Sequence, residues 1–209
     1  MGDLLTLELE QKALATREAL QSAVRQYGKV VYSNSLGAEA MVLTDIIWSH
    51  VPEIDIFSID TGRLHEETYE LLEKLERRYK KRITLVYPDS ESLAKLVDKQ
   101  GVNAFFHSLD ARLACCHVRK VEPFKRAIQG YGAWITGVRR PAVHDACPGD
   151  AGGVGRPRTA SIRSARCSTG PKSRYGSTSR PARFPYNVLH DRAFPSIGCS
   201  PCTPRYPAG

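Results

Sequence analysis

The chain has 209 residues, of which 42% are hydrophobic, so one domain with a substantial core is expected. No apolar run reaches the length of a membrane span, and the acidic, amphipathic N-terminus is unlike a secretory signal peptide. The net charge is +8, but residues 141–184 alone carry seven Arg and one Lys against two Asp and no Glu. This local excess does not indicate a nucleic-acid-binding face. We expect a soluble, cytoplasmic protein with neither nucleic acid nor membrane as a partner.

The hydrophobic pattern along the chain predicts alternating helices and strands. The first predicted helix begins at Asp3, ends near Tyr27 and is followed by the stop signal Gly28. Further helices are expected at 40–50, 66–79, 90–100 and 109–129, and strands at 30–32, 54–59, 83–87 and 133–137. Alternating units of this kind predict an α/β fold with a parallel sheet, which binds ligands at the carboxyl ends of its strands.

Polar residues follow the ends of three of these strands. Ser33–Glu39 comes after the first strand, Asp60 and Arg63 after the second, and Arg139 and Arg140 after the fourth. A strand, a loop of small residues and a helix can present backbone N–H groups to an anion, although many such turns only connect two elements. Arginine side chains suit phosphate or sulfate groups. Together these positions favour a phosphate-bearing ligand.

The cysteines form two pairs that are far apart in the sequence. Cys115 and Cys116 are adjacent, and Cys199 and Cys202 form a Cys-x-x-Cys motif. Neighbouring cysteines cannot easily form a disulfide with each other, but both can bind one large soft ligand. Four thiolates are the ligand set of a [4Fe-4S] cluster. A structural zinc ion and unligated buried thiols are the alternatives.

Five sequence blocks carry a resemblance to a known family. They are Ser-Asn-Ser-Leu-Gly-Ala-Glu-Ala (33–40), Ile-Asp-Thr-Gly-Arg-Leu-His-Glu-Glu-Thr-Tyr (59–69), Cys-Cys-His-Val-Arg-Lys-Val-Glu-Pro-Phe (115–124), Trp-Ile-Thr-Gly-Val-Arg-Arg (134–140) and the stretch from His190 to Cys202. Over residues 1–140 and 185–203 the chain resembles the assimilatory sulfonucleotide reductases. The four paired cysteines resemble the branch that reduces adenosine 5′-phosphosulfate (APS). The branch that uses the 3′-phosphorylated nucleotide (PAPS) usually lacks them.

The resemblance implies an adenine-nucleotide α-hydrolase-like fold, a [4Fe-4S] cluster, APS as the substrate, thioredoxin as the reductant and a possible homo-oligomer. By matching position, the implied substrate-binding residues are Ser33, Ser35, Gly37, Asp60, Thr61, Gly62, Arg63, Lys120, Arg139 and Arg140. Lys120 is expected between cluster and substrate, where a cation complements both charges; its alternative reading is an exposed helical lysine. The implied cluster ligands are Cys115, Cys116, Cys199 and Cys202. We read His107, His117 and His190 as ordinary polar residues and Trp48 and Trp134 as core residues.

Residues 141–184 depart from the family pattern. They contain six Gly, five Pro, six Ser and seven Arg but no Leu, a composition that favours disorder. We therefore divide the chain into a nucleotide-binding α/β domain (1–140), a non-matching segment (141–184) and a cluster segment (185–209). Similar length and an abrupt return of the pattern suggest a compensated reading-frame shift, with a genuine low-complexity insertion as the alternative. Cys147 and Cys167, inside this segment, are not expected to be cluster ligands.

The family's nucleophilic cysteine has no match in residues 1–209. In the family this thiolate lies in a Glu-Cys-Gly-Leu-His motif, attacks the sulfur of APS and forms an S-sulfocysteine from which thioredoxin releases sulfite. Here only seven residues follow Cys202, and none of them is cysteine. We therefore assign no catalytic residue and expect nucleotide binding without appreciable turnover, together with poor cluster loading. A PAPS reductase and a non-catalytic iron–sulfur or nucleotide-binding remnant are the alternative functions.

Overall fold

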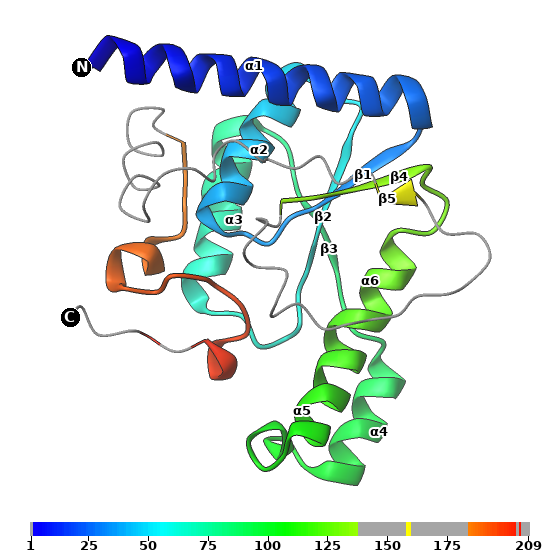
Figure 1. The fold of residues 1–209 in the computed structure, drawn as a ribbon. Coiled ribbons are helices and arrows are strands. Elements are labelled where there is room, and N and C mark those ends of the chain that lie inside the picture. The colour runs from blue at the N-terminus through cyan, green and yellow to red at the C-terminus, as the bar shows by residue number, and fades with distance from the viewer. Residues whose placement is uncertain (1, 138–157, 160–183, 204, 206–209) are drawn as a thin grey trace.

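The structure, a computed structural model, describes residues 2–137, 158–159, 184–203 and 205. Within them a single parallel sheet has the strand order β3-β2-β1-β4-β5 (Figure 1). The strands are β1 (Val30–Ser33), β2 (Asp55–Ile59), β3 (Thr84–Val86), β4 (Ala133–Thr136) and β5 (Arg158–Thr159). The strand order changes direction between β1 and β4, which pair in register from Val30 with Ala133 to Ser33 with Thr136. In sheets of this type, such a switch point is where ligands bind.

Helices cover both faces of the sheet. They are α1 (Gly2–Tyr27), α2 (Ala38–His50), α3 (Glu66–Tyr79), α4 (Ser90–Gln100), α5 (Leu109–Cys116) and α6 (Glu122–Ala127). Short helical turns are η1 (Ala104–Phe106), η2 (His117–Val121), η4 (Val188–Arg192) and η5 (Ser200–Cys202). Because side chains alternate along a strand, Tyr32 faces a core shared with α1, α2 and α3, while Phe57 meets Phe124 of α6 on the opposite face.

The parallel α/β architecture that the sequence predicts is confirmed. The predicted bounds of α3 and α4 agree with the structure, and the predicted strands correspond to β1 to β4 with shifts of one residue at most. Residues 141–184, whose composition favours disorder, include the two-residue strand β5, which pairs in parallel with β4. Of the other residues in this range, the structure describes only Phe184, which packs into the core with 7% of its surface exposed.

The helix predicted over residues 109–129 is confirmed as an unbroken helical run from Leu109 to Ala127, but a π turn inside it changes the hydrogen-bond pattern. The turn η2 separates α5 from α6 and ends two residues before Pro123. Proline has no N–H group, so residue 123 cannot donate the usual hydrogen bond to the carbonyl of Arg119. A wider turn at this point accommodates the missing bond, and such turns are frequent at functional sites. It carries Arg119 and Lys120 toward the carboxyl ends of the strands.

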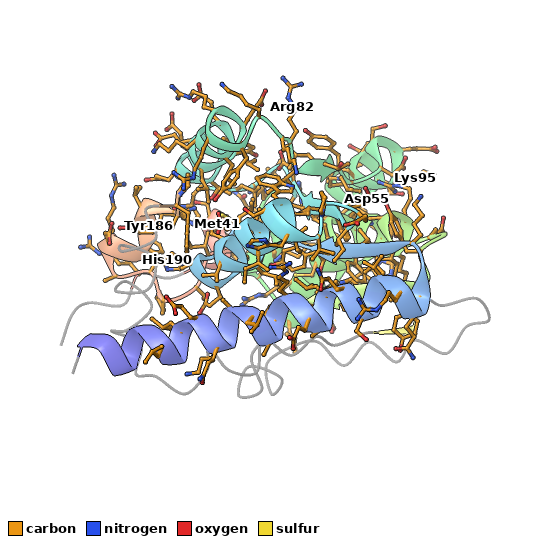
Figure 2. The ribbon with its side chains drawn as sticks, turned by 90° about the horizontal axis from the view of Figure 1, so that it is seen from above. Met41, Asp55, Arg82, Lys95, Tyr186 and His190 are labelled. Atoms are coloured by element: carbon orange, nitrogen blue, oxygen red, sulfur yellow. The ribbon has the colours of Figure 1, made fainter. Side chains whose placement is uncertain are left out.

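Residues 184–203, here called the Cys-x-x-Cys segment, pack beside α3 and the N-terminal end of α2. Asn187 is fully buried and its Nδ2 donates to Thr68 Oγ1 of α3 at 3.0 Å. Arg192 forms an ion pair with Glu67 of the same helix. Figure 2 shows Tyr186 and His190 of this segment near Met41 of α2. The segment thus returns to the carboxyl edge of the sheet, where the loops after β1 and β2 lie.

Lys80 offers a test of the helix-end geometry. It is the exposed C-cap of α3 and has a left-handed backbone, with φ of 54°. This conformation costs a side chain that has a Cβ about 1 kcal/mol, which glycine avoids. Lys80→Gly is therefore expected to raise the free energy of unfolding in urea by up to about 1 kcal/mol. The control, Lys80→Ala, keeps the Cβ and should give no increase; an equal gain from both variants would contradict the explanation.

Candidate functional site

Two adjoining cavities lie at the carboxyl edge of the sheet. The large cavity, about 740 Å³, is lined by the β1–α2 loop (residues 34–37), the ends of β1, β2 and β4, and the Cys-x-x-Cys segment. Its size lies within the range of small-molecule sites. The smaller thiol cavity, about 60 Å³, contains all four cysteines of the two pairs in its lining. Lys120 and Cys199 line both cavities, so the two sites share a wall.

The β1–α2 loop is held in one conformation by Asn34. Its Oδ1 accepts from Leu36 N at 2.7 Å, and its Nδ2 donates to Thr44 Oγ1 of α2 at 2.7 Å. This bonding holds the buried Leu36 at φ of 58°, a left-handed conformation that is costly for leucine. Gly37, the N-cap of α2, provides no side-chain cap. The loop therefore presents a helix N-terminus to the large cavity, an arrangement suited to an anion.

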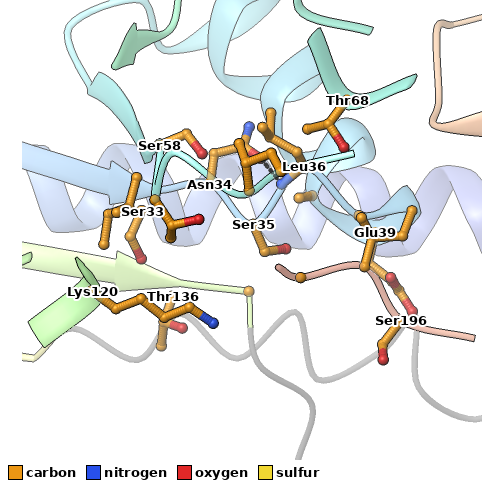
Figure 3. A pocket seen from close by; sticks show the side chains of 18 of the residues that line it. Ser33, Asn34, Ser35, Leu36, Glu39, Ser58, Thr68, Lys120, Thr136 and Ser196 are labelled. Carbon is orange, nitrogen blue, oxygen red and sulfur yellow. Dashed lines mark hydrogen bonds between the residues drawn. The ribbon is translucent and has the colours of Figure 1, made fainter. Parts of the chain in front are cut away.

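The two serines of this region play different parts. The Ser33 hydroxyl accepts from Trp134 Nε1 at 2.7 Å and donates to the carbonyl of Ile135 at 3.3 Å. Ser35 is exposed and lies in the wall of the large cavity (Figure 3). Gly37 lines the same cavity. Trp134, which we expected in the core, is only partly buried and lines this cavity. Ser35 therefore has the more available hydroxyl, while Ser33 fixes the indole.

The turn after β2 is built around a buried carboxylate. Asp60 is 5% exposed, and its Oδ1 accepts from Gly62 N at 2.8 Å and from the hydroxyl of Tyr69 at 2.9 Å. Burial, and next the bond to Asp60, raise the pKa of Tyr69 to about 12. Gly62 has φ of 69°, which favours glycine. Of the predicted residues Asp60, Thr61 and Gly62, only Thr61 lines the large cavity, so the other two shape the turn.

Arg63 lies at the thiol cavity, although the resemblance implied a place beside the nucleotide. Its Nη2 donates to the carbonyl of Val102 at 2.6 Å, its Nη1 donates to Asn103 Oδ1 at 3.3 Å, and the guanidinium stacks over the Phe105 ring at 4.8 Å. Its backbone carbonyl accepts from Ser200 N at 2.8 Å. Arg63 therefore joins the turn after β2 to the walls of the thiol cavity. Arg139 and Arg140 lie outside the described residues, as do Cys147 and Cys167.

The four cysteines are free thiols that face one cavity. Cys199 is buried, and its Sγ lies 3.2 Å from Thr61 Oγ1. Burial raises the pKa of Cys116; Lys120 opposes the shift, and Cys115, Cys199 and Cys202 add to it. The other three thiols therefore lie close enough to Cys116 to affect its pKa. Within the described part of the chain, no three Cys, His, Asp or Glu side chains converge closely enough to hold a single metal ion.

Cationic side chains border the thiol cavity. Arg119 is 7% exposed, and its Nη1 donates to the carbonyl of Thr61. Its buried Nε has no hydrogen-bond partner, and none of the described acidic side chains forms a recorded ion pair with it. A buried guanidinium without a counter-charge is costly. Together with the partly buried Lys120, it makes this cavity suited to an anionic group whose ligands are thiolates.

The three histidines that were read as ordinary polar residues have different surroundings. His107 is exposed, and His117 Nδ1 lies 3.2 Å from Glu122 Oε1 at the surface. His190 lines the large cavity, and its Nε2 accepts from Ala38 N, the first residue of α2, at 3.1 Å. This role was missed because 152 residues separate the partners, and no local pattern could reveal the contact.

None of the helices in the described ranges is both long enough and apolar enough to cross a membrane.

Comparisons with known proteins agree on one family. Residues 29–144 match the model of the phosphoadenosine phosphosulfate reductase domain. Adenosine 5′-phosphosulfate reductase of Allochromatium vinosum is 40% identical over 206 residues, covering 93% of this chain and 78% of the relative. The same-named protein of Neisseria meningitidis is 38% identical over 208 residues, covering 96% and 82%. The crystal structure of a PAPS reductase from Candida auris, a phosphate complex, has a TM-score of 0.69 at 24% identity and 90% coverage of both chains.

The role of Asn34 can be tested by stability. Asn34→Ala removes both loop hydrogen bonds and leaves the Leu36 amide buried without an acceptor. We expect urea unfolding to show a loss of about 2 to 3 kcal/mol. Ser35→Ala, at an exposed neighbouring position, should change stability by less than about 0.5 kcal/mol. Equal losses from the two variants would argue against the loop geometry described here.

Proposed function

This chain belongs to the family of the phosphoadenosine phosphosulfate reductase domain, and we propose that it acts in sulfate assimilation as a reductase of APS. The observation that carries the proposal is the shared wall between a nucleotide-sized cavity and a four-thiol cavity. The curated relatives named above are APS reductases. The likeness to the Candida auris enzyme supports the fold alone, so the PAPS-reducing alternative is the less favoured one.

In this proposal the large cavity binds the adenine nucleotide. The Ser35 hydroxyl lies on one side of it and Lys120 on the opposite side (Figure 3). The N-terminal residues of α2 and Thr61, in the turn after β2, also line it. Backbone N–H groups and a lysine ammonium are suited to the negative oxygens of a phosphosulfate. The assignment of Arg139 and Arg140 to the same group rests on the family resemblance.

We further propose that the thiol cavity holds a [4Fe-4S] cluster. In such a cluster each thiolate binds a different iron atom, so the four sulfurs surround the group without converging on one point. Four thiols on one cavity wall, with no three converging, support a cluster over a zinc ion, which needs every sulfur at about 2.3 Å. The unpaired Arg119 supports an anionic occupant. When bound, the cluster would supply negative charge beside the substrate, and Lys120 would lie between the two.

The proposed reaction transfers two electrons from a thioredoxin-type dithiol. In the family's reaction, the thiolate of the Glu-Cys-Gly-Leu-His cysteine, which has no match in residues 1–209, attacks the sulfur of APS. The bond from that sulfur to the phosphate oxygen breaks, and its electron pair leaves on AMP. One thiol of reduced thioredoxin then attacks the resulting S-sulfocysteine and displaces sulfite. The second thiol resolves the mixed disulfide, so that thioredoxin ends oxidised and the cysteine returns as a thiolate. The residues of the large cavity bind and orient the nucleotide in this scheme.

The binding role can be separated from turnover in a protein made of residues 1–209. We expect it to bind AMP and APS but to release negligible sulfite, because the Glu-Cys-Gly-Leu-His motif has no match in these residues. Isothermal titration calorimetry measures nucleotide binding. A sulfite assay with APS or PAPS and reduced thioredoxin measures turnover. Normal turnover would show that another thiol attacks the substrate, and absence of nucleotide binding would refute the assigned cavity.

Lys120 gives a second test of the cavity. Lys120→Ala should weaken APS binding roughly tenfold or more, because a charge-assisted hydrogen bond to the substrate is lost. Lys125→Ala removes an exposed lysine of α6 that lines neither described cavity and serves as the control. Affinities for APS and for AMP are measured by calorimetric titration of each variant. A larger loss for APS than for AMP would place Lys120 beside the sulfate group. Equal affinities for Lys120→Ala and the wild type would remove Lys120 from the substrate site.

The cluster is tested by anaerobic reconstitution with iron and sulfide. The sequence alone led us to expect poor loading, but Asn187 and Cys199 hold the second thiol pair against the α/β domain. About four iron atoms per chain and a brown absorbance band are therefore expected. Cys116→Ser should reduce the iron content strongly, whereas Cys147→Ser and Cys167→Ser, the matched controls, should load like the wild type. A chain that takes up one zinc ion in preference to iron would support the zinc alternative instead.

A further inference from the structure

His190 is fixed by two backbone hydrogen bonds, one from each ring nitrogen. Nε2 lies 3.1 Å from Ala38 N, and Nδ1 lies 2.9 Å from the carbonyl oxygen of Phe194. A carbonyl oxygen can only accept, so Nδ1 carries the proton and Nε2 keeps the lone pair that accepts from Ala38. The bond to Phe194 therefore sets both the orientation and the tautomer of the ring. His190 is in this way prepared to act as an acceptor for the amide of α2.

This bond caps the N-terminus of α2. The first N–H groups of a helix have no partner inside the helix, and the N-cap Gly37 offers no side chain. His190 supplies the acceptor for the first of them from a segment that is remote in sequence. The same helix end forms a wall of the large cavity, and His190 itself lines that wall. Loss of the imidazole would therefore act directly on the loop assigned to the phosphosulfate.

Further contacts of the Cys-x-x-Cys segment join it to α3 and to the turn after β2. Asn187 and Arg192 bond to Thr68 and Glu67 of α3. Cys199 Sγ lies 3.2 Å from Thr61 Oγ1, and Ser200 N donates to the carbonyl of Arg63, both in the turn after β2. These contacts are independent of the Ala38 amide. A change confined to His190 should therefore loosen the link to α2 while the remaining contacts keep the segment folded.

We propose that His190 is a positioning residue that links nucleotide binding at the β1–α2 loop to the placement of the Cys199–Cys202 pair. This inference rests on the proposed nucleotide site. It adds a structural link through which binding in the large cavity affects the thiol cavity. A nucleotide that orders the N-terminus of α2 strengthens the bond to His190 and holds the Cys-x-x-Cys segment more firmly. By linkage, a firmly held segment raises nucleotide affinity by the same factor.

Two substitutions of His190 test its hydrogen bonds to Ala38 and Phe194 independently. His190→Gln can place a carbonyl oxygen near the position of Nε2 and keep an acceptor for Ala38. His190→Asn can donate to the Phe194 carbonyl, as Nδ1 does, but is too short to reach Ala38. Hydrogen–deuterium exchange is measured on the full chain without nucleotide, with circular dichroism confirming that each variant folds. His107→Ala, at an exposed position, is the control.

His190→Asn should speed exchange about tenfold in peptides covering residues 36–41 and 196–203, the factor expected for one lost hydrogen bond. His190→Gln and His107→Ala should behave as the wild type. Unchanged exchange in His190→Asn, or equal increases in the Asn and Gln variants, would overturn the positioning role.

The link to the nucleotide is tested by adding AMP. In the wild type and in His190→Gln, AMP should slow exchange of peptides 196–203 several-fold; in His190→Asn this slowing should disappear and AMP affinity should fall about three- to tenfold. AMP binding to the wild type without slowing would overturn the link. No AMP binding at all would overturn the proposed nucleotide site and the link with it, while the exchange data without nucleotide still decide the positioning role.

Discussion

Thr61 is the residue on which the geometry of both cavities depends. Its carbonyl accepts from the buried Arg119, its hydroxyl lies 3.2 Å from Cys199 Sγ, and the same hydroxyl accepts from the amide of Arg63. These contacts join the end of β2, the π turn and the Cys-x-x-Cys segment at one point that is 2% exposed. The large cavity and the thiol cavity therefore have a common frame. Movement of the π turn or of the Cys-x-x-Cys segment would therefore also displace Thr61 in the wall of the large cavity.

Local periodicity was sufficient to predict most of the elements. The apolar stripe of α3 and the β-branched run of β1 show directly in the sequence which residues each element buries. Because helices and strands alternate along the chain, the strands are expected to pair in parallel. The edge position of Ser35 and Thr61 follows as well, because strand ends in a parallel sheet gather on one side. No periodic pattern connects the two cysteine pairs, so placing all four together rested on the chemistry of thiolate ligands and in part on the family resemblance.

Features set by remote partners were not predictable in this way. An aromatic residue in a strand is typical of a core, yet the indole N–H of Trp134 needs an acceptor and finds it in Ser33 beside the cavity. The direction of Arg63 is decided by Val102 and Phe105, about 40 residues further along the chain. The π turn is different, because Pro123 was visible in the sequence and its missing N–H group is the physical signal.

The contacts of residues 184–203 bear on the poor cluster loading that the sequence led us to expect. Phe184 lies in the core and Asn187 is fully buried against Thr68, so the Cys-x-x-Cys segment is held by contacts with the α/β domain. Closing a connecting loop costs only about 0.6 kcal/mol for each doubling of its length. Losing one buried hydrogen-bonded side chain costs about 1 to 3 kcal/mol. The approach of Cys199 to Thr61 therefore depends more on Asn187 than on the number of residues that connect the two thiol pairs.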